Sequence, residues 1–196
     1  LYTVPLEGGH ATRLTSGMQF DGQPRYSPDG SRIVFVSDRD GAENVWLARA
    51  DGSDLRQLTQ GKHHSFVSPA WTADGEYVVV SRGQWGSGDE LWMYHVAGGA
   101  GVQVTKKKLK PDTPERTALG VVASPDGRFL FYTRRTVTEG RIYRFSSCQI
   151  ARRDLTTGEE DMLTETAGGA MRPWLSPDGS KLAYGTRDGA QTGLRI

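Results

Sequence analysis

The sequence predicts an all-β fold, because one turn motif recurs along the chain and short runs rich in β-branched and aromatic residues follow it. The motif reads Ser-Pro-Asp-Gly, or Thr-Ala-Asp-Gly in its second copy, and its four copies contain Asp29, Asp74, Asp126 and Asp178. Successive aspartates lie 45, 52 and 52 residues apart. Repeats of about 40–50 residues, each with four short strands, indicate a β-propeller of four-stranded antiparallel blades.

The first complete unit shows why strands and turns alternate. Pro28 fixes the backbone for a turn, Gly30 permits a left-handed conformation, and Asp29 can accept hydrogen bonds from nearby backbone N–H groups. Such turns separate the apolar runs along the unit. Strands are therefore expected at residues 24–26, 32–37, 44–48 and 56–59, with turns at 27–30, 38–41 and 51–53.

A fixed offset joins the third and fourth strands of each unit. Thirteen residues separate Tyr2 from Thr15, Trp46 from Thr59, Trp92 from Thr105, and Ala151 from Thr164. The third unit also carries a polar insertion at 133–147, which we expect to form a loop on one face. We assign residues 1–196 to one propeller domain, with units at about 1–15 (partial), 23–59, 68–105, 118–164 and 171–196 (partial).

The two ends of the sequence occupy matching places in the repeat. Tyr2 aligns with Trp46, so the chain enters at a third strand, and it stops 18 residues after Asp178, where a third strand would begin. We expect a segment of a larger propeller, since the sequence lacks an initiator methionine and stops abruptly. The alternative is a four-bladed ring in which the two ends complete one shared blade.

Composition narrows the classes of partner. The formal net charge is +1, so no strong field favours nucleic acid, and no apolar stretch approaches the ~20 residues of a membrane span. The single cysteine, Cys148, permits no internal disulfide. The basic run at 106–110 is typical of a solvated loop between blades. We expect no nucleic-acid partner and no membrane insertion.

The sequence contains no recognisable catalytic motif. The four histidines, at positions 10, 63, 64 and 95, form no His-x-His pair, and no Gly-x-Ser-x-Gly elbow is present. Cys148 has arginines but no histidine close by in the sequence. The acidic stretch 38–44 lacks the later ligands of a calcium loop and fits a hairpin turn. We predict no catalytic residue, no metal site and no cofactor in this chain.

Candidate binding residues therefore come from loops. Trp85 lies in a glycine-rich loop, where a large apolar side chain is a candidate contact for a partner. The insertion and the basic run supply the other candidates, which are Arg134, Arg135, Arg141, Lys107 and Lys108. The repeat-matched tryptophans are expected instead to pack between blades; they are Trp46, Trp71, Trp92 and Trp174.

The repeated Ser-Pro-Asp-Gly, Ser-Asp-Arg-Asp-Gly, tryptophan-bearing and Leu-Thr segments resemble the WD-like propeller repeats of the TolB family. Residues 14–59 and 91–107 most resemble the propeller segment of large bacterial amidohydrolase-related proteins, in which such repeats precede a metal-dependent hydrolase barrel. The resemblance implies a β-propeller over essentially the whole chain. It implies a periplasmic or secreted location as well.

The resemblance implies a non-catalytic module for protein interaction or substrate gating, with a protein partner or a fused hydrolase domain. One alternative is a stand-alone TolB-like periplasmic scaffold that binds other proteins. A second alternative is a hydrolase whose site lies in the propeller channel. Whether the parent protein is a metal-dependent amidohydrolase stays open at the level of the sequence.

Overall fold

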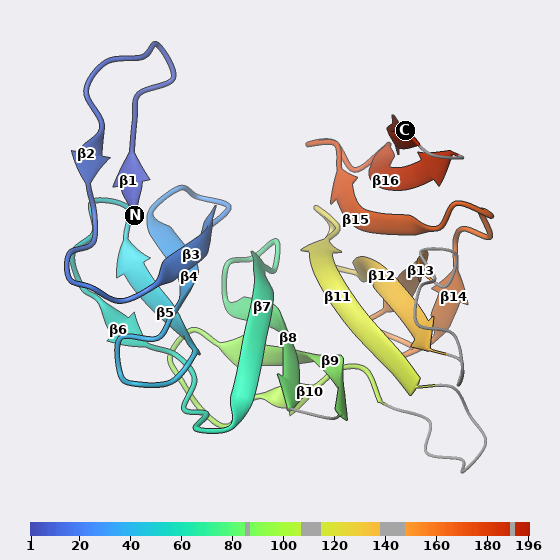
Figure 1. Cartoon of the computed structure of the whole chain (residues 1–196), viewed down its shortest axis with the longest axis horizontal. Coiled ribbons are helices and arrows are strands. Elements are labelled where there is room, and N and C mark those ends of the chain that lie inside the picture. Colours follow the sequence, from blue (N-terminus) through green and yellow to red (C-terminus); the bar gives the residue numbers. More distant parts are fainter. Residues whose placement is uncertain (85–86, 107–114, 138–147, 189–190) are drawn as a thin grey trace.

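The computed structural model describes residues 1–84, 87–106, 115–137, 148–188 and 191–196. Every regular element in these residues is a β-strand, and the strands form five antiparallel sheets. The sheets stand side by side in an arc, with the first strand of each larger sheet towards its centre (Figure 1). This arrangement confirms the predicted all-β propeller of four-stranded blades.

Three sheets have four strands, in the order of the sequence from the centre of the arc outwards. The first holds β3 (Asp21–Tyr26), β4 (Arg32–Ser37), β5 (Asn44–Arg49) and β6 (Arg56–Gln57). The second holds β7 (His64–Trp71), β8 (Tyr77–Gln84), β9 (Ser87–His95) and β10 (Val102–Gln103). The third holds β11 (Glu115–Ala123), β12 (Phe129–Val137), β13 (Cys148–Asp154) and β14 (Glu160–Met162).

Two smaller sheets flank these blades. One pairs β1 (Tyr2–Thr3) with β2 (Thr12–Arg13), and the other contains β15 (Ala170–Leu175), β16 (Leu182–Asp188) and β17 (Gln191–Arg195). They lie on opposite sides of the opening in the arc and remain separate sheets (Figure 1). The shared closing blade of the four-bladed alternative is therefore not formed between them.

The repeated turn motif is a local hydrogen-bonding device. The hydroxyl of Ser27 donates to Asp29 at 2.5 Å, and the Asp29 carboxylate accepts the backbone N–H of Ser31 at 3.1 Å. Gly30 follows with a φ of 70°. The other three copies form the same bonds, centred on Asp74, Asp126 and Asp178. These bonds lower the pKa of each aspartate. The aspartates therefore stabilise the turns.

The core lies between neighbouring blades. Val34 and Leu47 of the first blade pack with Phe66, Val78 and other residues of the second. A separate cluster joins the second blade to the third; it includes Val79, Leu91, Ala118, Leu130 and Tyr132. The second blade thus contributes to two clusters, one shared with each neighbouring blade. No helix in the described residues is long and apolar enough to cross a membrane.

Candidate functional site

The inner strand of every larger sheet carries a bulge at the same place in the repeat. The register of β3 with β4 shifts between Gly22 and Arg25, and equivalent shifts occur in β7, β11 and β15. Each bulge contains a residue of positive φ, six positions before the motif aspartate. These residues are Gln23 (55°), Ser68 (56°), Gly120 (63°) and Arg172 (54°).

Three of these four bulge residues have side chains that disfavour a left-handed backbone. Such a conformation costs of order 1–3 kcal/mol in a non-glycine residue and persists where surrounding structure holds it. Here the preceding blade supplies that support at two positions. Gln23 Oε1 accepts the backbone N–H of Ser68 at 2.5 Å, and Thr133 Oγ1 accepts that of Arg172 at 2.9 Å. These two hydrogen bonds therefore tie the bulges of β7 and β15 to the blade that precedes each of them.

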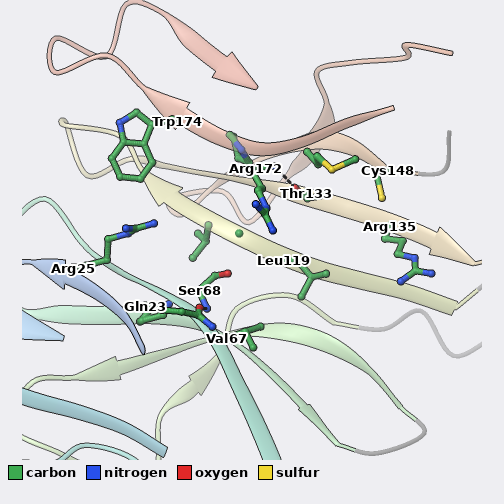
Figure 2. A pocket seen from close by; sticks show the side chains of 15 residues that line it. Gln23, Arg25, Val67, Ser68, Leu119, Thr133, Arg135, Cys148, Arg172 and Trp174 are labelled. Carbon is green, nitrogen blue, oxygen red and sulfur yellow. Dashed lines mark hydrogen bonds between the residues drawn. The ribbon is translucent and has the colours of Figure 1, made fainter. Parts of the chain in front are cut away.

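A cavity of about 900 Å³ lies where these bulged strands converge. Three arginines line it, Arg25, Arg135 and Arg172, and no aspartate or glutamate is among its lining residues. Val67, Leu119 and Met171 contribute apolar surface. Arg25 and Trp174 stand at one end of the cavity, Arg135 and Cys148 at the other, and the Arg172 side chain points between them (Figure 2). The cavity is thus cationic with an apolar lining.

Among the described residues, the cavity arginines have no carboxylate partner. None of the three forms an ion pair within the part of the chain that the structure describes, where Arg39 and Arg128 bind Asp21 and Asp154. Arg25 instead lies over the ring of Trp174, with its Cζ 5.0 Å from the ring centroid. This contact joins β3 to β15, and the ring attracts the guanidinium without supplying a negative charge.

Cys148 is half-buried in the wall of the cavity, opposite Arg135 in the register of β12 and β13. Burial raises the pKa of its thiol, and the nearby Arg135 opposes that effect only in part. No histidine is among the lining residues of the cavity, so no imidazole base accompanies the thiol there. The described residues also hold no group of three histidine, cysteine or acidic side chains that could bind a metal ion.

The structure separates the two neighbouring arginines predicted for binding. Arg135 is exposed and lines the cavity, whereas Arg134 is only 3% exposed. The Arg134 guanidinium lies 3.4 Å from Glu90 of the second blade and also bonds Glu160 of its own blade. Its position therefore supports a role in holding blades together. Four other predicted binding residues lie outside the described residues: Trp85, Lys107, Lys108 and Arg141.

The expectation that all repeat-matched tryptophans pack between blades is wrong for Trp174. Trp71 is 8% exposed within one core cluster, Trp92 is partly buried against the same cluster and Trp46 against another, but Trp174 is 55% exposed in the cavity. Trp71 lies three residues before its motif aspartate and Trp174 lies four before. Because successive side chains on a strand point to opposite faces, one position moves the ring from core to cavity.

Sequence reasoning also missed Arg25 and Arg172. The signal was available in part, because Arg25 lies four residues before Asp29 on a predicted strand, and Arg172 lies six residues before Asp178 in the last predicted unit. What the sequence lacked was the bulge, which decides the face to which each of these side chains turns.

A family model described as the Tricorn protease N-terminal beta propeller domain matches residues 1–151. Tricorn protease homolog 1 of Streptomyces coelicolor is 35% identical over 81 residues, which are 41% of this chain and 8% of that protein. The uncharacterized peptidase YuxL of Bacillus subtilis is 28% identical over 188 residues, 94% of this chain and 24% of that protein. The chain thus spans a quarter or less of these two relatives.

Solved structures agree on the fold. TolB from Acinetobacter baumannii superposes with a TM-score of 0.73 at 23% identity, covering 98% of this chain and 44% of that chain. An oligogalacturonate lyase in complex with manganese superposes with a TM-score of 0.65 at 18% identity, covering 97% of this chain and 51% of that chain. The likeness to TolB confirms the TolB-like propeller that the repeats predicted.

Proposed function

The chain belongs to the Tricorn protease N-terminal β-propeller domain family, and on that premise we propose that it is a non-catalytic module of a larger bacterial hydrolase, in which it binds a protein partner or gates substrate. One observation carries this proposal: the inner strands converge on a cavity of about 900 Å³ whose three arginines have no ion-pair partner among the described residues. Cavities of about 300–1,000 Å³ suit ligands, and unpaired charge supplies specificity.

Two classes of hydrolase suit such a module. The sequence of the repeats favours a larger protein of the amidohydrolase-related type. The similarity to the tricorn protease homologue and to the peptidase YuxL favours a peptidase. A periplasmic or secreted location accompanies the TolB-like fold in this proposal. The intact mass of the native protein, with peptide mapping past Ile196, separates these cases: a His-x-His segment downstream identifies the amidohydrolase, and a mass near 21.5 kDa favours the stand-alone scaffold.

Cys148 allows a direct test of gating. It is the only cysteine of the chain and lines the cavity, so a bulky maleimide on its thiol should obstruct the site. In the native protein we expect this modification to lower turnover of long substrates by about tenfold and to spare short chromogenic ones. The same reaction on the Cys148→Ser variant controls for thiols elsewhere in the protein.

Two results would contradict the proposal. Equal turnover of long substrates before and after modification of Cys148 would remove the cavity from the path of the substrate or partner. Hydrolysis by the 196-residue chain alone, abolished by substitutions within the cavity, would replace the non-catalytic module by the channel-site hydrolase of the second alternative.

A further inference from the structure

We propose that the cavity binds an extended acidic peptide segment, whose side-chain carboxylates pair with Arg25, Arg135 and Arg172 and whose apolar side chains lie against the apolar wall. This inference rests on the proposed function, because it names the ligand class of the same site. It follows from the charge of the cavity, the spread of its arginines and the surface between them.

Charge selects an anion. The lining residues include three guanidinium groups and no carboxylate, so nothing within the wall neutralises them. Some arginines elsewhere in the described residues bind an acid on a neighbouring strand: Arg152 binds Asp161 at 2.8 Å and Arg128 binds Asp154 at 2.8 Å. Arg32 instead donates to the backbone carbonyl of Gly75 in the next blade. Planar guanidinium groups match carboxylates with paired hydrogen bonds. A ligand that bears carboxylates would therefore supply the ion-pair partners that the cavity wall does not provide.

The positions of the arginines select a ligand with several anions. Arg25 comes from β3, Arg135 from β12 and Arg172 from β15, so three different blades contribute. Arg25 stands at the end of the cavity away from Arg135, with Arg172 between them (Figure 2). A single small anion such as phosphate cannot pair with both ends at once. A chain with repeated carboxylates can.

The remaining wall selects a peptide. Val67, Leu119 and Met171 lie among the lining residues and provide apolar surface that acidic side chains alone would not cover. The ring of Trp174, which a sugar could otherwise stack against, already has the Arg25 guanidinium over it. Alternating acidic and apolar side chains, as in an extended peptide, fit this mixture of charges and apolar surface better than a polyuronate does.

The bulge at Arg172 fixes one of the three cations. Its φ of 54° is left-handed, and its N–H is held by Thr133 Oγ1 at 2.9 Å. An arginine has no conformational reason to occupy such a position, which glycine occupies in the third blade at Gly120. The backbone strain is retained together with a side chain that points into the cavity (Figure 2).

The test measures binding of a peptide of alternating glutamate and leucine that carries an uncharged BODIPY dye on its N-terminus and an amide at its C-terminus, so that only side chains carry charge. Fluorescence anisotropy with the native protein should give saturable binding that weakens as salt is added. Replacing Arg25, Arg135 and Arg172 together by glutamine should weaken it at least about tenfold. The Arg13→Gln variant, which removes an exposed arginine outside the cavity, should bind like the native protein.

A second variant separates binding from folding. Glycine accepts the backbone of position 172 without strain, so Arg172→Gly should weaken peptide binding while the melting temperature stays the same or rises. Loss of affinity in that variant cannot come from failure to fold. Unchanged affinity in both the triple variant and Arg172→Gly would overturn the proposal.

Competition decides the class of ligand. Unlabelled acidic peptide should displace the probe, whereas oligogalacturonate and inorganic phosphate at equal charge should not. Equal displacement by all three, or equal binding of a lysine–leucine peptide, would overturn the acidic-peptide assignment. If no peptide binds but modification of Cys148 still blocks turnover of long substrates, the ligand class is wrong and the gating module stands; if both fail, the proposed function fails too.

Discussion

Arg134 and Arg135 are neighbours on β12, yet they serve two different regions of the molecule. Arg134 turns into the interface between the second and third blades, where Glu90 and Glu160 neutralise it and 3% of its surface remains exposed. Arg135 turns into the central cavity, where no carboxylate is among the lining residues. Successive side chains of a strand point to opposite faces of the sheet. An arginine on one face of β12 therefore stabilises the fold, whereas an arginine on the other face is available to a ligand.

The largest effect is expected from removing Arg134 from the interface between the second and third blades. Arg134→Ala leaves Glu90, which is 5% exposed, without its buried cation, and removes one of the partners of Glu160. We expect the free energy of unfolding to fall by about 3 kcal/mol, because an uncompensated buried charge is costly. Urea denaturation at neutral pH measures it. Arg135→Ala is the matched control, with a change within about 0.5 kcal/mol; equal losses in both variants would show that the contrast is wrong.

A smaller effect is expected where the two regions meet. Thr133 is 5% exposed, and its hydroxyl accepts the backbone N–H of Arg172 in the next sheet. Thr133→Val keeps the shape of the side chain but removes this acceptor, and it should lower the free energy of unfolding by about 1–2 kcal/mol. Thr12→Val on the exposed strand β2 serves as the control. A stability loss equal to that of the control would mean that the bulge does not depend on this hydrogen bond.

Substitutions at two equivalent bulge positions, Arg172 and Gly120, should change stability in opposite directions. Arg172→Gly removes left-handed strain but adds backbone entropy to the unfolded chain. We therefore expect the free energy of unfolding to stay unchanged or to rise by up to about 1 kcal/mol. Gly120→Ala introduces the strain at the equivalent place, where φ is 63°, and should destabilise by about 1 kcal/mol. Melting temperatures should shift by about 2–4 °C per kcal/mol in a chain of this length. Shifts of the same sign would contradict the strain assigned to these positions.

The turns could be predicted from sequence and the cavity could not, for a physical reason. Ser27, Asp29 and Gly30 satisfy one another within a few residues, so their pattern determines the turn locally. Ser68 and Arg172 adopt left-handed conformations that their own residue types disfavour, and contacts across blades hold them there. A bulge shifts the phase of a strand, which is why Arg172 was not expected in a site. Trp174 was expected in the core because it was matched with Trp71, from which it differs by one position in the repeat.

The smallest expected effect probes the far end of the cavity through Cys148. Burial raises the pKa of this thiol, while the positive charge of Arg135, its register partner on β12, acts in the opposite direction. Alkylation by iodoacetamide requires the thiolate, so its rate should reach half-maximum above the ordinary thiol pKa of about 8.5. Arg135→Gln should move that midpoint further up, whereas Arg134→Gln should leave it unchanged in the folded protein. A midpoint that follows Arg134 instead would place the uncompensated charge in the blade interface and would reverse the assignment of the two arginines.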